Sequence, residues 1–246
     1  MSRIIIAITG SSGSGKTTLS HALAKSFGDN AVCLSTDFYY KGRSPEEPIA
    51  DYLKKNFDHP DELLLDKFAE DAKNLFEGRS IKRPEIDFKG GTFIRTDNAV
   101  ELDTRPVIIL EGIFCLLHVK VRELVANYGY SIMTHAPSAI VLKRVLERDA
   151  IARHKPMELT LSVYTKNVLH GYFDFIKPLK TQCDLRLLTW TREEGDVSVD
   201  KLTQTSLTVL LPKLSPNLIE TFVTSDSTHE ILKDHIAQTR EFLLSK

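Results

Sequence analysis

The sequence contains little cysteine, has no long apolar run and carries no excess charge of either sign. Its three cysteines form no C-x-x-C pair and no other metal-ligand spacing, so neither a disulfide framework nor a zinc site is expected. The run from Val107 to Val119 is interrupted by Glu111 and Gly112 and falls short of the ~20 residues that span a bilayer. The apolar segment 4–8 is too short for a signal sequence. We therefore expect free thiols, a cytoplasmic location and no membrane association.

The balance of charges limits the partners of the chain. With 32 Lys and Arg against 33 Asp and Glu, the formal net charge is -1. Such a chain has no overall positive field to attract nucleic acid, and its basic residues are scattered among acids. We therefore expect no nucleic-acid partner, and any site for an anion must be local.

Strand and helix patterns alternate along most of the 246 residues, of which 42% are apolar and 26% charged. Residues 3–9 form a β-branched apolar run typical of a strand buried on both faces, and the apolar spacing over 16–27 indicates a helix that ends at Gly28. Strands are further expected at 31–35, 106–110, 130–134, 184–188 and, in the tail, 207–211; a hairpin at 81–102; and helices at 61–77, 119–127, 137–153, 158–176 and 231–244, with a loop from 36 to 60. This alternation predicts an α/β fold with a doubly wound, mainly parallel sheet and helices on both faces. Ligands of such sheets bind beyond the carboxyl ends of the strands.

A phosphate-binding motif lies between the first predicted strand and the first predicted helix. Its residues match G-x-x-x-x-G-K-[ST] and are, with the threonine that follows, Gly10, Ser11, Ser12, Gly13, Ser14, Gly15, Lys16, Thr17 and Thr18. The glycines let backbone N–H groups point at phosphate oxygens, and the helix start adds the positive end of its dipole. Lys16 would contact the β- and γ-phosphates, and the Thr17 hydroxyl would bind Mg²⁺. A flexible Gly/Ser turn is the alternative, and the flanking strand and helix argue against it.

Two acids follow neighbouring predicted strands. Asp37 comes just after the strand 31–35, and Glu111 comes directly after the strand 106–110. Both would face the phosphate site from the same edge of the sheet, where one could hold a metal and the other act as a general base. The alternative for each is a solvated loop acid or a helix cap.

Six segments, in this order and approximate spacing, resemble the uridine kinase (uridine–cytidine kinase) family, which is related to phosphoribulokinases. They are 10–18, 35–39, 56–61 (Asn-Phe-Asp-His-Pro-Asp), 84–88 (Pro-Glu-Ile-Asp-Phe), 109–113 and 144–149. The first is common to many nucleotide enzymes, whereas Asn-Phe-Asp-His-Pro-Asp is much more specific. The resemblance implies a P-loop kinase core over about residues 1–190, with the hairpin at 81–102 as an excursion and a helical lid at 137–157. Residues 191–246 would then form a C-terminal extension packed on the core.

The resemblance also implies the reaction and its residues. The family transfers the γ-phosphoryl group of ATP or GTP, with Mg²⁺, to the 5′-hydroxyl of a pyrimidine ribonucleoside, and its members are often homo-oligomers. Asp37 resembles the base that takes the hydroxyl proton, and it would surround Mg²⁺ together with Thr17 and Glu111. Asp58 resembles the acid that binds the ribose hydroxyls, although a cap for the helix entered at Pro60 is the alternative. The substrate-binding positions implied are Asp37, Tyr39, Asp58, Ile86, Phe88 and Arg148.

Three arginines resemble the lid arginines of the family, which close over the triphosphate. Arg144 and Arg148 share one face of a predicted helix, and Arg153 lies somewhat round from them. Lid closure would exclude the water that competes with the acceptor hydroxyl. The alternative is a solvated basic face that pairs with Glu147 and Asp149.

Some positions depart from the family. At the pyrimidine base, Ile86 stands where the family has tyrosine and Gly91 where it has histidine; Val163 falls near a base-associated glutamine, and Lys155 replaces the last lid arginine. A kinase for another small alcohol, such as a sugar phosphate, is therefore a second hypothesis. A nucleotide-binding regulator without catalysis is a third, against which the retained Asp37 argues.

Overall fold

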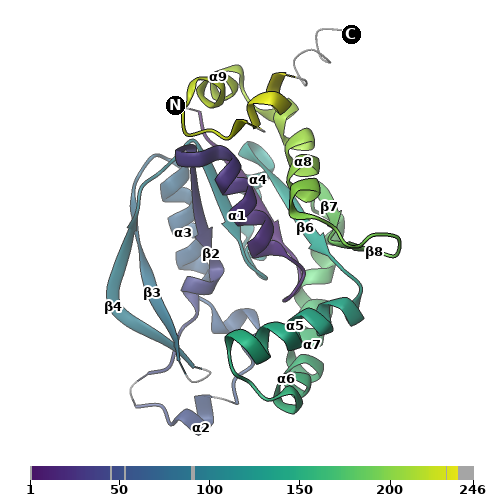
Figure 1. Ribbon diagram of the computed structural model, residues 1–246. Helices are drawn as coiled ribbons and strands as arrows, with labels where there is room; N and C mark the ends of the chain where they lie inside the picture. Colours follow the sequence, from purple (N-terminus) through teal and green to yellow (C-terminus); the bar gives the residue numbers. More distant parts are fainter. Residues whose placement is uncertain (1, 45, 53, 90–91, 231, 238–246) are drawn as a thin grey trace.

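The core of the protein is a five-stranded sheet in which all neighbouring strands are parallel. The computed structural model describes residues 2–44, 46–52, 54–89, 92–230 and 232–237, with the side chains of 87–97 outside this description. In spatial order the strands are β2 (Ala31–Ser35), β5 (Val107–Glu111), β1 (Ile4–Thr9), β6 (Gly129–His135) and β7 (Leu185–Leu188). The predicted α/β fold is thereby confirmed, and the carboxyl ends of the strands meet at one edge (Figure 1).

Helices cover both faces of the sheet because successive side chains of its strands point to opposite sides. Ile5 and Ala7 of β1 pack into a core with α3 (Leu65–Phe76) and α4 (Val119–Tyr128). The alternate residues of β1 pack on the other face, against α1 (Lys16–Phe27) and α8 (Val199–Leu210). Two cores therefore hold the strand that leads into the phosphate-binding motif.

A hairpin of β3 (Ile81–Lys89) and β4 (Thr92–Leu102) stands beside the sheet (Figure 1), as the sequence predicts. It contains a bulge between Pro84 and Ile86. Two of the positions that the family resemblance singles out, Phe88 and Gly91, lie here: Gly91 and the side chain of Phe88 are outside the described residues.

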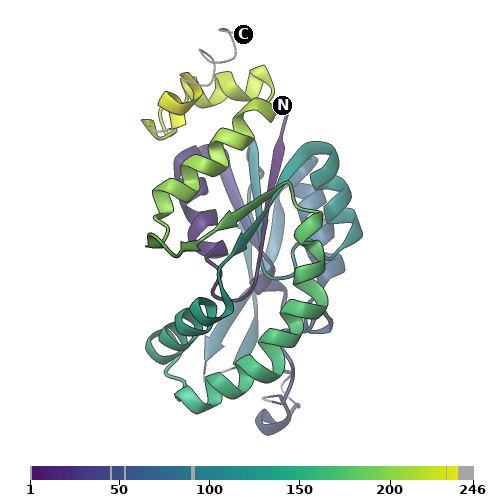
Figure 2. The same ribbon diagram turned by 90° about the vertical axis from the view of Figure 1, so that its right-hand side faces the viewer.

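The segment 137–157, where a lid is expected, is a helix followed by a turn, and a long helical rod continues from it (Figure 2). The helix is α5 (Ser138–Ala152), and the rod begins with α6 (Met157–Val163). It continues through a π-helical turn (Tyr164–Val168), α7 (Leu169–Gly171), a second π-helical turn (Tyr172–Ile176) and a 3₁₀ turn (Lys177–Thr181). The single helix predicted at 158–176 thus exists, with two local widenings of the kind often found at functional sites.

The C-terminal part is helical where a strand was expected. A short hairpin, β8 (Trp190–Thr191) with β9 (Gly195–Asp196), is followed by α8 and α9 (Pro216–Thr224). The strand predicted at 207–211 is wrong, because these residues end α8 and enter the 3₁₀ turn Leu211–Lys213. Of the helix predicted at 231–244, residues 232–237 are helical, as is Glu230 just before it, and the rest lies outside the described residues.

Two further corrections concern the segment before α3. The expected loop contains a 3₁₀ turn (Thr36–Tyr39) and the short helix α2 (Ile49–Tyr52). The helix predicted from residue 61 starts at Leu65, because Pro60–Glu62 forms a separate 3₁₀ turn whose cap is the side chain of His59. Asp58 is therefore not that cap. Within the described residues, no helix is long and apolar enough to cross a membrane.

Candidate active site

The phosphate-binding motif forms a tight loop between β1 and α1. Gly13 adopts a φ of 75°, and a Cβ atom built there would lie 2.9 Å from the Val145 Cγ2 atom of α5. A side chain at this position would therefore be strained and would push the lid helix away. The hydroxyl of Ser14 is bonded to that of Thr134 on β6 (2.7 Å), so the loop is fixed to the sheet as well as to the lid.

Lys16 lies at the start of α1, where the loop surrounds it. Its side chain is buried, and Nζ donates to the carbonyl oxygen of Ser11 at 2.9 Å. Burial lowers the pKa of Lys16, and the carboxylates of Glu111 and Asp37 oppose that shift. The ammonium group is thus held inside the loop that would receive phosphates.

Glu111 ends β5 next to the loop and is buried. One carboxylate oxygen accepts from the Ser35 hydroxyl (2.5 Å) and the other from the Thr17 hydroxyl (3.4 Å). Burial raises the pKa of Glu111, and the charge of Asp37 raises it further, whereas Lys16 lowers it. This edge of the sheet therefore brings together the residues that the sequence predicts around Mg²⁺.

Mg²⁺ prefers oxygen ligands and keeps several ligands from water or phosphate. The hydroxyl of Thr17 and the carboxylate of Glu111 offer oxygen ligands of this kind, and Asp37 lies on the same side of the site. The described residues include no cluster of three or more His, Cys, Asp or Glu that could hold a metal ion by itself. The donor set thus fits an ion shared with a nucleotide rather than a closed protein site.

Asp37 lies on the 3₁₀ turn that follows β2, with an exposed side chain. The turn is capped by the Ser35 hydroxyl, which accepts from the Asp37 backbone N–H at 3.2 Å. The carboxylate of Asp37 is close enough to raise the pKa values of Lys16 and Glu111. Asp37 is therefore at the phosphate loop and open to a ligand, as the sequence predicts.

These residues line one cleft of about 530 Å³ that continues between the lid and the turn after β2. Its walls comprise three groups of residues. The first is the loop and its acids, namely Ser12, Gly13, Gly15, Lys16, Thr17, Thr18, Asp37 and Glu111. The second includes Tyr40, Phe57, Asp58, Arg148, Arg153, Lys155, Thr160, Val163, Tyr164 and Val168. The third includes Arg144, Thr189, Asp196, Val197, Val199 and Leu202.

Asp58 is partly buried on the wall of the cleft. Burial raises its pKa to about 6, although Arg148, Lys16, Arg153 and Lys155 all favour its charged form. Its backbone N–H donates to the Asn56 side-chain oxygen (3.0 Å). A Cβ atom at Gly171 on the lid rod would lie 2.3 Å from the carbonyl oxygen of Asp58, so only glycine permits this approach. The Asp58 backbone is thus packed closely against Gly171, and its carboxyl group lies within the electrostatic influence of Arg148, Arg153 and Lys155.

Two of the expected lid arginines share one buried acid. Arg148 donates to a carboxylate oxygen of Asp149 (2.8 and 2.9 Å), and Arg153 pairs with the same oxygen (3.3 Å). Arg148 also donates to the Ser12 hydroxyl of the phosphate loop (3.2 Å). His154, which follows Arg153, has a φ of 51°, a conformation that residues other than glycine rarely adopt. Arg153 and Lys155, on either side of this residue, both line the cleft.

Arg144 is placed differently from the other two arginines. Its guanidinium donates to the Gly13 carbonyl, to both oxygens of Thr189 and to the Asp196 carboxylate, at 2.6–3.3 Å. Arg144 therefore links the phosphate loop and the lid helix to the β8–β9 hairpin, and its role toward the triphosphate stays a prediction.

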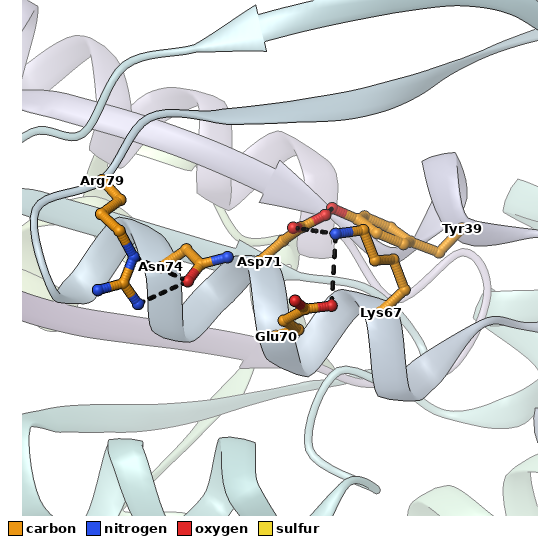
Figure 3. A network of polar contacts seen from close by, with 6 residues as sticks. All are labelled: Tyr39, Lys67, Glu70, Asp71, Asn74 and Arg79. Atoms are coloured by element: carbon orange, nitrogen blue, oxygen red, sulfur yellow. Dashed lines mark hydrogen bonds and ion pairs between the residues drawn. The ribbon is translucent and has the colours of Figure 1, made fainter.

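Several of the expected site residues lie outside the cleft. Tyr39 is fully buried, with its ring on Phe68 and its hydroxyl donating to Asp71 of α3 (2.8 Å) (Figure 3). Ile86 packs against the core that contains α3. The loop residues outside the cleft lining are Gly10, Ser11 and Ser14.

Some residues that line the cleft are not among the expected site residues. Tyr40 lines it where its neighbour Tyr39 does not. Asp149 also lines it and pairs with Arg148 and Arg153, as the alternative for the lid arginines expects. Thr160 and the residues of the wall beyond Thr189 lie in no motif.

Comparison with known proteins finds relatives over most of the chain. The chain matches the model of the phosphoribulokinase / uridine kinase family over residues 5–192. The uridine kinase of Borrelia duttonii (strain Ly) is 35% identical over 181 residues, which is 74% of this chain and 84% of that protein. The uridine kinase of Leuconostoc citreum (strain KM20) is 30% identical over 210 residues, 84% of this chain and 96% of that protein.

Solved structures show the same fold. Phosphoribulokinase from Rhodobacter spheroides superposes with a TM-score of 0.56 at 15% identity, covering 78% of this chain and 73% of that one. D-glycerate 3-kinase from Cryptococcus neoformans superposes with a TM-score of 0.55 at 14% identity, covering 80% and 89%. These two likenesses concern the architecture alone.

Proposed function

Because the chain belongs to the phosphoribulokinase / uridine kinase family and is therefore a P-loop kinase, we propose that it transfers the γ-phosphoryl group of ATP or GTP to the 5′-hydroxyl of a pyrimidine ribonucleoside. The observation that carries this proposal is the position of Asp37. Its exposed carboxylate lies beside Lys16 and Glu111, in the same cleft as Asp58. A cleft that only binds nucleotides does not require a base at that position.

The phosphate loop and Lys16 would bind the triphosphate. The loop backbone offers N–H donors at the start of α1, and Lys16 offers a charge next to the β- and γ-phosphates. Thr17 and Glu111 would hold Mg²⁺, which neutralises phosphate charge when it is bound. Positioning and charge neutralisation are the main tasks of a protein in phosphoryl transfer.

Asp37 would act as the general base. The 5′-hydroxyl oxygen attacks the γ-phosphorus while its proton passes to the Asp37 carboxylate. A new O–P bond forms, the bond from the γ-phosphorus to the bridging oxygen breaks, and the nucleoside diphosphate leaves with the electron pair. The nearby charges of Lys16 and Arg148 would stabilise the negative charge that shifts to the leaving group.

Asp58 would bind the ribose. A carboxylate can accept hydrogen bonds from two adjacent hydroxyls, so a sugar that lacks one of them leaves the acid partly unpaired. The rigid contact between Asp58 and the rod at Gly171 would keep this acid at a fixed distance from Asp37.

Asp37→Asn tests the proposal. We expect kcat with uridine to fall by about 100- to 10,000-fold, the usual contribution of a general base, while ATP binding measured by titration calorimetry changes little. Asp51→Asn is the matched control, because Asp51 is an exposed acid of α2 that pairs with Lys54 and lies outside the cleft lining.

The acceptor class is tested with the wild-type enzyme. Uridine, cytidine, purine ribosides and sugar phosphates should be compared by release of ADP. Turnover of a sugar phosphate without turnover of any nucleoside would support the other-alcohol hypothesis, and ATP binding without turnover of any alcohol would support the regulator hypothesis. Activity of Asp37→Asn close to that of the wild type would exclude Asp37 as the base.

A further inference from the structure

Thr160, on the first turn of the lid rod, carries a buried hydroxyl without a partner. The residue is 3% exposed and lines the cleft, and its hydroxyl oxygen is out of contact with solvent, so a ligand would reach it after a rotation of the side chain. Among the described residues, only the hydroxyls of Thr160 and Thr36 are buried side-chain groups without a hydrogen bond. Thr36 lies away from the cleft, against Gly112. A buried polar atom without a partner costs free energy. At a binding cleft, a ligand could supply the missing hydrogen bond.

The hydroxyl of Thr160 also avoids the partner that helical threonines normally take. Such hydroxyls bond the carbonyl four residues earlier, and in this chain those that do so at 2.8–2.9 Å include Thr165, Thr203, Thr205, Thr208, Thr221 and Thr224. The Pro156 carbonyl is bonded by the Thr160 backbone N–H alone (3.1 Å). The hydroxyl is therefore left for another partner.

The other neutral polar groups on this wall of the cleft already have partners. The Tyr40 hydroxyl donates to the Phe57 carbonyl (2.8 Å), and the Tyr164 hydroxyl donates to the Ser138 carbonyl (3.2 Å). Both tyrosines thus present mainly their rings to the cleft, next to Phe57, Val163 and Val168. Between the charged residues Asp58, Arg153 and Lys155, the uncharged part of this wall is aromatic and aliphatic apart from the Thr160 hydroxyl. Such a surface suits a flat, neutral heterocycle that has a polar edge.

We propose that the Thr160 hydroxyl binds the polar edge of the pyrimidine base of the acceptor and thereby sets the specificity of this enzyme for a nucleoside. The inference rests on the proposed function. A hydroxyl can donate and accept, so the same residue serves a ring carbonyl and a ring amino group. Thr160 would supply a hydrogen bond that neither Ile86 nor Val163 can make.

Thr160→Val and Thr160→Ser test the proposal. Valine keeps the shape and removes the hydroxyl, so we expect kcat/KM for uridine and cytidine to fall about tenfold or more, with KM for ATP unchanged. Serine keeps the hydroxyl and should retain kcat/KM within about threefold of the wild type, by the same comparison. Thr165→Val is the matched control, because Thr165 lies on the same rod and its exposed hydroxyl bonds the Leu161 carbonyl.

A riboside with a phenyl ring in place of the base identifies the group that is bound. This acceptor has no polar ring edge, so Thr160→Val and the wild type should use it equally well. Thermal unfolding of the apo protein provides a second readout: the valine variant should have a Tm equal to or above that of the wild type, because the substitution removes an unpaired buried hydroxyl.

Two kinetic results would overturn the assignment to Thr160 while leaving the kinase intact. One is wild-type kcat/KM for uridine in Thr160→Val, and the other is an equal loss with the phenyl riboside. A lower Tm for the valine variant would show that the hydroxyl has a partner within the protein and would also overturn it. Absence of nucleoside turnover in the wild type would overturn the proposed function and this inference together.

Discussion

Asp58 is a partly buried acid and Glu111 a buried one, and burial raises the pKa of both carboxyl groups. The neighbouring cations limit this effect without cancelling it, since burial is the largest cause in both cases. For Asp58 the shift brings the pKa to about 6, within the range in which an enzyme can be assayed. The charge state of a side chain that we assign to the ribose therefore depends on pH.

This gives a prediction for the pH dependence of catalysis. The carboxylate form of Asp58 accepts hydrogen bonds from the ribose hydroxyls, and that form is lost as the pH falls through about 6. We expect kcat/KM for uridine to rise between about pH 5 and 7, because this parameter reports the free enzyme. Asp58→Asn should lower kcat/KM at pH 8 and should remove this pH dependence.

The free energy of unfolding provides a second check of the Asp58 pKa. The charged form that favours substrate binding lowers this free energy. Because the pKa in the folded state is raised from 3.8 to about 6, the folded state binds the proton more tightly, and the charged form opposes folding at higher pH. Urea unfolding should therefore show Asp58→Asn to be more stable, relative to the wild type, at pH 8 than at pH 4. The assignment of Asp58 to the ribose would be contradicted if Asp58→Asn kept the wild-type pH profile of kcat/KM. It would also be contradicted if the stability difference between the two proteins were the same at pH 4 and pH 8.

The neighbours Tyr39 and Tyr40 show what the sequence does not reveal about single residues. The motif that contains Asp37 predicts correctly that this segment reaches the phosphate loop. It does not say which of the two tyrosines faces the cleft, because a 3₁₀ turn changes the direction of its side chains by about 120° per residue. Contacts with α3, far away in the sequence, direct Tyr39 inward.

At the scale of elements, the turn that carries Asp37 is held by helix α3. The backbone of Leu64 donates to the Tyr39 carbonyl (2.8 Å), and Tyr40 forms a bridge with Leu63. Deeper in the molecule, the Tyr39 hydroxyl and Lys67 bond different oxygens of the buried Asp71 (Figure 3). A helix outside the cleft thus determines where the proposed base lies.

Tyr39→Phe should reveal this attachment. A buried hydrogen bond to a charged group stabilises a protein by about 1.5–3 kcal/mol, and Asp71 would keep only Lys67. We expect the free energy of unfolding in urea to fall by that amount. Tyr128→Phe is the control, because its side chain is 53% exposed on α4. Equal stabilities of the two variants would mean that the Asp71 contact does not hold the turn.

Strong local signals decided which elements the sequence could predict. Helix α1 and strand β2 have the predicted bounds, since Gly28 ends the helical spacing just before a short apolar run. The apolar run 207–211 was misread because five residues cannot distinguish a strand from a buried helix end. Leu202, Leu207 and Leu210 follow a helical spacing, and they bury one face of α8 in the core shared with α1.

At the scale of the whole molecule, the C-terminal helices complete the core behind the phosphate loop. Asn30, just past α1, donates to the Thr228 hydroxyl (3.0 Å), and the His229 backbone donates to the Ser26 carbonyl (3.1 Å). These helices lie beyond residue 192, where the match to the family model ends. Figure 2 shows α8 beside α1, and residues of α8 and α9 share one core with α1, so these helices are expected to unfold together with it.

Phe222→Ala tests that cooperativity. Phe222 of α9 is fully buried, and its ring centroid lies 5.0 Å from that of Phe27 in α1. Truncating such a side chain costs about 3–5 kcal/mol, whereas Val223→Ala, at a residue that is 38% exposed, should cost far less.

The single tryptophan, Trp190, lies in β8, so its fluorescence reports a distant part of the molecule. In Phe222→Ala, fluorescence and circular dichroism should shift together to lower urea concentration, because one cooperative unit has lost part of its core. A helical signal lost at lower urea than the Trp190 transition would instead show that the C-terminal helices unfold as a separate unit.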